Sequence, residues 1–195
     1  VTAAAEEGGG RIGNGRVEIA VNTAPGRLLE RWTVDGRDLV VADGATVTAG
    51  TGTISLGADL KADGTADNDG VGTLTVAGSA LATSANATAG AITLRGADIE
   101  LTAVAGVNVS ATGAGGGVAI RSSDAARPVS LGGTNSAVPG VNLTDTELTL
   151  ITTLAGGTVT IGDSGQVGDI TLTTATPATT SGAKIVVVQS TAGGG

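Results

Sequence analysis

The sequence lacks most of the side chains on which catalysis and ligand binding usually depend. Its 195 residues include no Cys, His, Met, Phe or Tyr, and Trp32 is the one aromatic residue. Without His, the usual general base and commonest transition-metal ligand is missing. Without Cys there is no disulfide, thiolate nucleophile or zinc-thiolate site. The lack of aromatic rings also removes the platforms on which sugars and bases stack. We therefore expect a protein that is not an enzyme and that holds no cofactor.

Charge and hydropathy argue against nucleic-acid-binding, membrane-spanning and disordered proteins. The net charge of −8 argues against nucleic acid as a partner, because no basic patch is present to release counterions. No apolar run approaches the ~20 residues of a membrane helix, so we expect no membrane insertion. Disordered chains have low hydropathy and high charge, whereas this chain is 41% hydrophobic and 14% charged. It should therefore fold, with small aliphatic side chains buried in thin, repeated layers.

From residue 44 onward the chain repeats one short pattern, an apolar–polar–apolar segment bounded by Gly, Asp or Asn. Alternation with a period of two is typical of half-buried β-strands. Glycine-rich breaks between the segments suit tight corners that need a positive φ. The predicted strands are 46–48, 53–56, 73–76, 92–94, 99–101, 107–109, 118–120, 129–131, 141–143, 148–150, 159–161, 170–172 and 185–187.

The spacing of these segments favours a solenoid. Two series of segments begin at nearly equal intervals, the first at Val107, Val118, Val129 and Val141, the second at Leu148, Val159 and Ile170. Two or three short strands per ~22 residues match one turn of a parallel β-helix, in which each coil buries its face on the next. The predicted fold is all-β, a parallel β-helix. An antiparallel β-sandwich, which also has closely spaced strands, is the alternative.

The first 43 residues differ from the rest and predict an N-terminal cap or connecting segment before the β-solenoid region at 44–195. They hold 12 of the charged residues and the single Trp. A strand is expected at 16–21, followed by a turn at Pro25–Gly26.

Two interpretations remain for the next part of this segment. Leu28, Leu29 and Trp32 could lie on one face of a short helix. The preferred interpretation is a hairpin of strands 31–34 and 38–41 around Asp35–Gly36, a pair favoured in type I′ turns.

Two longer stretches resemble a known family. Residues 90–102 (GAITLRGADIELT) and 157–173 (GTVTIGDSGQVGDITLT) are similar to the repeats of filamentous-haemagglutinin-like bacterial exoproteins and adhesins. The resemblance covers about residues 45–190 and implies a right-handed parallel β-helix. It implies a structural shaft segment, outside the cell or on the bacterial surface, whose partners are neighbouring segments of a longer chain or copies of itself.

The family's secretion domain carries Asn-Pro motifs, and this chain has none. The chain also begins at Val1 without Met and without a signal peptide. Both features predict an internal or processed segment of a longer protein.

Two other functions compete with the shaft. Exposed strand edges at the ends of a β-helix invite pairing, so the chain could be a self-assembling subunit of an extracellular filament or sheath. The third interpretation is a polysaccharide-active β-helix enzyme. It depends on Asp98 and Glu100, which alternate onto one face of a strand, with Arg95 and Arg121 on neighbouring coils. A carboxylate pair can serve as acid and base.

One acidic cluster is a candidate calcium site. Asp63, Asp67 and Asp69 supply carboxylate oxygens, the ligands that Ca²⁺ prefers. Their spacing matches neither the EF-hand loop nor the nonapeptide of calcium-binding β-rolls. A solvated loop of turn-forming residues is the competing interpretation.

Three Asn-X-Ser/Thr sequences, at Asn86, Asn108 and Asn142, match the N-glycosylation pattern, although a Thr-rich chain produces chance matches. Because Asn108 and Asn142 lie in the middle of predicted strands, we expect their side chains to point outward. Residues 185–188 lack alternation, which predicts either a strand buried on both faces or a terminal strand that pairs with a partner.

Overall fold

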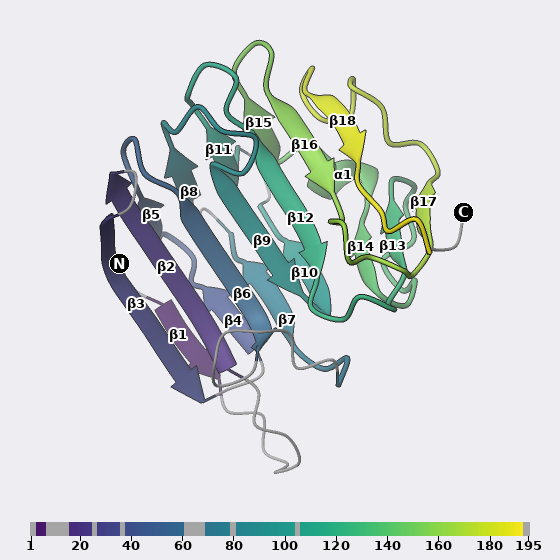
Figure 1. The fold of residues 1–195 in the computed structure, drawn as a ribbon, viewed down its shortest axis with the longest axis horizontal. Coiled ribbons are helices and arrows are strands. Elements are labelled where there is room, and N and C mark those ends of the chain that lie inside the picture. The colour runs from purple at the N-terminus through teal and green to yellow at the C-terminus, as the bar shows by residue number, and fades with distance from the viewer. Residues whose placement is uncertain are drawn as a thin grey trace.

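The chain folds as a parallel β-helix (Figure 1). The computed structural model describes residues 3–6, 16–24, 27–35, 38–60, 69–78, 81–103 and 106–192, with the backbone alone up to residue 35. Among them, every strand pair is parallel except those made by β1 (Ala3–Glu6), β2 (Arg16–Ala24) and β3 (Arg27–Asp35). The predicted solenoid is confirmed, and the antiparallel sandwich is not formed.

Three sheets make up the coils, and the chain visits them in turn. The first contains β4 (Asp38–Val41), β7 (Thr73–Val76) and β10 (Asp98–Leu101). The second contains β5 (Thr46–Thr48), β8 (Leu81–Ser84), β11 (Val109–Ala111) and β15 (Ile151–Thr153). The third contains β6 (Ile54–Leu60), β9 (Ile92–Gly96), β12 (Val118–Ser122), β16 (Thr158–Ile161) and β18 (Lys184–Val187).

Next to β10 in space lies a smaller parallel sheet. Its strand order, starting beside β10, is β14 (Val141–Leu143), β13 (Val129–Leu131), β17 (Ile170–Leu172). The chain leaves β13, turns back and enters β14 on the side toward β10. Gly140 makes this return possible, since it has a φ of 100° and a Cβ there would collide with the carbonyl oxygen of Pro128. A single helical turn, α1 (Asp145–Leu148), then leads to the second sheet.

The core consists of rows of aliphatic side chains that stack from coil to coil. In the third sheet, Leu56, Leu94, Ile120 and Ile161 stand in register, and each is fully buried. Thr and Ser take most alternate positions and are partly exposed. Small β-branched and aliphatic residues fill such a thin core without the aromatic rings that a thicker core uses.

The coils are longer than the sequence spacing indicated, and they are unequal. One inward row runs through Ile54, Ile92, Val118, Val159 and Ile185, so each of these steps is one complete coil. The coil length expected from the spacing is therefore too short. The near-constant interval between segments measures the distance between successive strands along the chain, because one complete coil contains two to four strands joined by loops of unequal length.

Four strand assignments also change. Residues 148–150 form the end of α1 and its turn instead of a strand, because Thr144 and Glu147 cap a helical turn just before them. The strand expected at 107–109 begins only at Val109, as β11. The pattern missed β8 and β15, where Ala, Thr or Ser takes positions that the pattern requires to be apolar.

The predicted N-terminal hairpin was wrong. Residues 31–34 belong to β3, which pairs antiparallel with β2, whereas 38–41 form β4 in a different sheet. The short helix at 28–32 is also wrong, since those residues lie within β3. The long strands β2 and β3 pair along their length, which offers more ladder bonds than a hairpin with the short arms expected. β2 also pairs with β6.

Among the described residues, no helix is long and apolar enough to span a membrane.

We expect the stacked rows to dominate stability. Leu94→Ala removes a fully buried side chain and should lower the free energy of unfolding by about 2–5 kcal/mol. Leu172→Ala is the matched control, because Leu172 ends an inward row and is 44% exposed. Its cost should stay below about 1 kcal/mol. Urea unfolding followed by circular dichroism measures both free energies of unfolding. Equal losses in the two variants would contradict the claim that the buried rows dominate stability.

Candidate functional site

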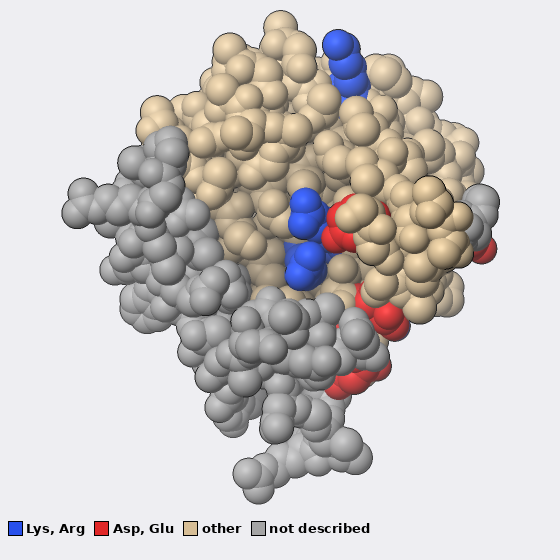
Figure 2. Space-filling model, in the orientation of Figure 1, with Lys and Arg blue, Asp and Glu red and all other residues tan. Residues whose placement is uncertain are grey.

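Charged side chains are sparse on the face shown in Figure 2, where basic atoms lie near the centre beside acidic atoms. Elsewhere on the described part of this face, most atoms belong to uncharged residues. Three features stand out in the described chain: the acidic loop at Asp69, a carboxylate cluster at β10, and the C-terminal end of the coils.

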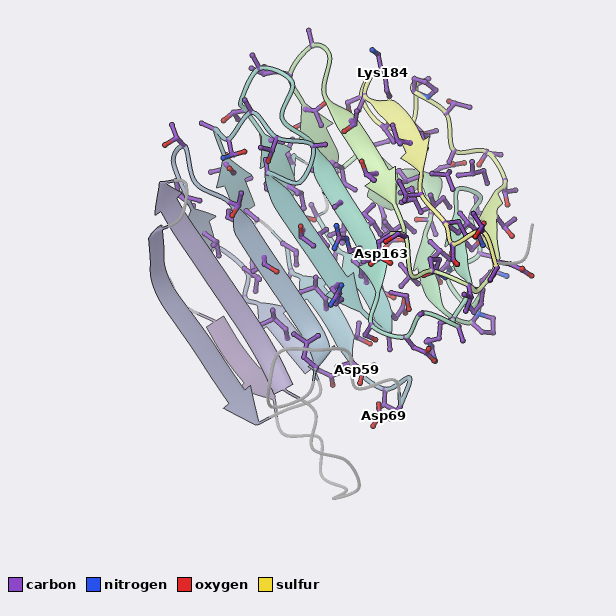
Figure 3. The ribbon with its side chains drawn as sticks, in the orientation of Figure 1. Asp59, Asp69, Asp163 and Lys184 are labelled. Carbon is purple, nitrogen blue, oxygen red and sulfur yellow. The ribbon has the colours of Figure 1, made fainter. Side chains whose placement is uncertain are left out.

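The acidic loop is described only in part. Asp63 and Asp67 lie outside the described residues, and Asp69 lies at the edge of the molecule (Figure 3). The Asp69 carboxylate accepts the N–H of Val71 at 2.9 Å, and the Arg127 guanidinium donates to the carbonyl of Gly70 at 3.0 Å. In the described ranges, no group of three or more acidic side chains could hold a metal ion. The calcium site stays a prediction.

Carboxylates join β10 to β14 where the first sheet gives way to the smaller one. The Asp98 carboxylate accepts the N–H of Asn142 on β14 at 3.2 Å and that of Ile99 at 2.8 Å. Glu147 of α1 accepts the N–H of Leu101 at 3.1 Å. In a regular parallel sheet, carbonyl groups of the neighbouring strand would accept such bonds. Side-chain oxygens have replaced them here.

Glu147 also holds the α1 turn in place. Its second oxygen accepts the N–H of Thr144 at 2.9 Å and the Thr144 hydroxyl at 2.8 Å, while the Glu147 N–H donates back to that hydroxyl at 3.3 Å. This reciprocal arrangement is a capping box. Glu147 is only 8% exposed, so it links β10 to the start of α1 from within the protein. Sequence reasoning missed Glu147, although the Thr-X-X-Glu pattern was present.

Burial makes the neighbouring carboxyls harder to ionise. Desolvation raises the pKa of Asp98, and the charge of Glu147 adds to this, while the N–H groups of Ile99 and Asn142 and the charge of Arg127 oppose it. Desolvation also raises the pKa of Glu100, and the charges of Glu147 and Asp98 act in the same direction. The structure thus brings the predicted pair Asp98 and Glu100 together on β10 and adds a third carboxyl to it.

The two central asparagines are buried, contrary to the expectation that they point outward. The Asn108 side-chain amide donates to the carbonyl of Gly78, and its oxygen accepts the N–H of Ala103. The Asn142 amide donates to the carbonyl of Asn135 at 2.7 Å. Their exposed fractions are 0% and 4%. Each side-chain NH2 therefore fastens a loop to the coil, while the Asn142 Oδ1 is buried without a hydrogen-bond partner among the described atoms.

The C-terminal end of the solenoid leaves its inward rows uncovered. Val187 continues the row of Leu56 and is 43% exposed, and Leu172 continues the row of Leu131 and is 44% exposed. Ile170 and Ile185, earlier on the same strands, are only partly buried. The register partners of these four residues on β13 and β16 are fully buried. This pattern is expected where a stack of coils stops and nothing lies on top.

The strand edges at this end are open as well. Within the described chain, β18 pairs with β16 alone, and β17 pairs with β13 alone. Residues 185–187 therefore form a terminal strand, one of the two expectations for this segment, and are not buried on both faces. We call Ile170, Leu172, Ile185 and Val187, together with these two edges, the open end. It offers both apolar surface and unpaired backbone groups.

Comparisons with protein-family models, with curated proteins and with solved structures gave no match.

The carboxylate cluster should make stability depend on pH. A carboxyl whose pKa is higher in the folded than in the unfolded protein destabilises the fold once it is ionised. The free energy of unfolding that Asp98 and Glu100 contribute should therefore fall as pH rises above their ordinary pKa values of 3.8 and 4.5. Asp98→Asn with Glu100→Gln keeps the acceptor oxygens and removes both charges.

We expect this double variant to be at least as stable as the wild type at pH 7. Acidification from pH 7 to pH 5 should raise the free energy of unfolding less in the double variant than in the wild type. A gain of about 1 kcal/mol would raise the Tm by roughly 2–4 °C. Thermal unfolding at both pH values measures it. Asp169→Asn, at an exposed position, controls for the loss of negative charge alone. An unchanged pH dependence in the double variant would contradict the assignment.

Proposed function

We propose that this chain is a structural shaft segment of a secreted bacterial surface adhesin or exoprotein of the filamentous-haemagglutinin type. The observation that carries the proposal is the open end, where inward rows that are buried through every earlier coil become exposed. Such a surface is suited to receive a further coil. In a shaft, that coil comes from a neighbouring segment of the same long polypeptide.

The coil architecture supports a mechanical role. Successive described coils contact each other through strands in register, so stability comes from repeated nearest-neighbour interfaces. Such an array extends along one axis without needing a larger core. The outward positions of the strands carry mainly Thr and Ser, which fits a stiff element that faces water along its length.

The repeat style described in the sequence supports placing this shaft outside the cell or on its surface. Both quoted stretches fall on stacked strands: residues 90–102 cover β9 and β10, and residues 157–173 cover β16 and β17. Their degenerate Gly-bounded pattern corresponds to strand and corner in the coils. A chain without Cys also needs no control of thiol oxidation in such a location.

A self-assembling filament subunit is the second candidate, and the open end favours it too. In that case the coil that covers the end belongs to another copy, and the partner is the chain itself. The two candidates differ in whether isolated chains elongate without limit.

For a shaft segment we expect the isolated chain to form small, discrete species and no fibres. Sedimentation velocity over a range of concentrations and electron microscopy measure this. Leu172→Arg with Val187→Arg places charges on the open end and should remove any residual association. Val71→Arg, at another exposed aliphatic residue, is the matched control. Long fibres that the double variant abolishes would establish the filament candidate instead.

We expect antibodies raised against residues 44–192 to label intact, unpermeabilised cells of the source bacterium or to detect the protein in its culture medium. A secreted shaft is accessible without lysis. Immunofluorescence before and after permeabilisation measures the accessible share. Signal that appears only after permeabilisation would contradict both extracellular candidates, whatever the association state of the purified chain.

A further inference from the structure

Two arginines stand side by side on the outward face of the third sheet. Arg95 on β9 and Arg121 on β12 are register partners in a parallel pair. Neighbouring strands lie about 4.8 Å apart, so their guanidinium groups leave the sheet next to each other. Like charges at directly paired positions destabilise a sheet. An acidic chain of net charge −8 nevertheless keeps two cations on adjacent rungs.

One carboxylate is shared loosely by this pair. The Asp163 oxygen Oδ2 lies 3.8 Å from Arg95 and 3.9 Å from Arg121. Both distances exceed the roughly 2.7–3.2 Å typical of a hydrogen bond. The other oxygen of Asp163 accepts the N–H of Gly165 at 2.8 Å, which fixes the carboxylate to its own turn. Figure 3 shows Asp163 just after the end of β16 on the face of this sheet.

Arg121 has hydrogen-bond capacity to spare. Its Nε is buried and has no hydrogen-bond partner among the described atoms, and its ion pair within the described chain is the loose contact with Asp163. The side chain as a whole is 37% exposed, so its terminal nitrogens reach solvent. A guanidinium carries five N–H donors in a planar fork that matches an oxyanion. Arg121 therefore presents donors toward water with no described acceptor at hydrogen-bond distance.

The surroundings of the pair are polar and open. One row earlier along the strands, on the same face, lie Ser55, Thr93, Ala119 and Thr160, so three of these four residues carry a hydroxyl and the one on β12 is a buried alanine. In Figure 2 the basic atoms over β9 and β12 lie in a hollow of this face, next to acidic atoms.

We propose that Arg121, beside the positive charge of Arg95, binds an oxyanion group, the carboxylate or sulfate of a hydrophilic organic molecule, which displaces the Asp163 carboxylate. The Arg121 guanidinium binds such a group with charge-assisted hydrogen bonds, and the charge of Arg95 on the next rung adds to the attraction. The hydroxyls of Thr93 and Thr160, on the strands either side of Ala119, then contact the hydroxyl-bearing part of the same molecule. A long polyanion is disfavoured by the net negative charge of the chain, so the ligand carries few charges.

Backbone amide NMR titration at low ionic strength tests this proposal, with sodium sulfate and sodium glucuronate as separate probes. Sodium chloride at matched ionic strength serves as the reference. We expect saturable shifts confined to residues around Arg95, Arg121 and 163–165. A response to sulfate alone identifies a sulfate-type ligand, and a stronger response to glucuronate identifies a carboxylate on a hydroxyl-rich carrier.

Three variants make the test specific. Arg121→Gln should weaken binding about tenfold or more, since it removes a charged donor set. Asp163→Asn keeps an acceptor for the Gly165 N–H and removes the competing charge, so it should strengthen binding several-fold. Lys184→Gln removes an exposed cation on β18 of the same sheet and should leave binding unchanged.

Circular dichroism checks that each variant keeps the β spectrum, and Asp163→Asn stands as the test if Arg121→Gln does not fold. Three outcomes overturn the proposal: no saturable shift with either probe, equal affinity in Arg121→Gln and the wild type, or unchanged affinity in Asp163→Asn. None of them bears on the open end, so the shaft is tested separately.

Discussion

Parallel register between successive coils is the constraint on which the rest of this structure depends. An inward side chain at one rung has to fit on the equivalent side chain of the next, as Leu56, Leu94 and Ile120 do. The coil interior is thin, so aliphatic residues fill it and aromatic rings are not needed. The shortage of aromatic residues, which argued against stacking sites for sugars and bases, therefore follows from the architecture. A stack of this kind also has no natural end, which is why its last rungs carry exposed aliphatic residues.

The stacking of the first sheet is interrupted after β10, and side chains repair the interruption. The chain makes the extra excursion through β13 before it returns to β14 beside β10. Asp98 and Glu147 accept the backbone N–H groups that a regular neighbouring strand would have bonded. Carboxylates are strong acceptors, but burial raises the pKa of Asp98 and so makes its ionisation less favourable. The repair thus stabilises the geometry while it adds an electrostatic cost.

Much of the fold could be predicted from the sequence, because alternation of apolar and polar residues is a local property. It located strands such as β7, β13 and β16 well. Pairing is not local, and so the partner of 31–34 was missed. The site was less predictable. Asp98 and Glu100 were identified as a pair, but the third carboxyl comes from a distant turn. The exposure of Leu172 depends on what stacks above it, which no local pattern records.

The unequal coil lengths have a consequence for how such a chain can change. Rungs stay in register although the coil from Val118 to Val159 is much longer than the one from Ile92 to Val118. Lengthening a surface loop costs little free energy, since closure entropy grows only slowly with length. Insertions and deletions at the corners are therefore tolerated while substitutions in the rows are not. Such a protein can gain new surface loops through evolution and keep the spacing of every side chain on its faces.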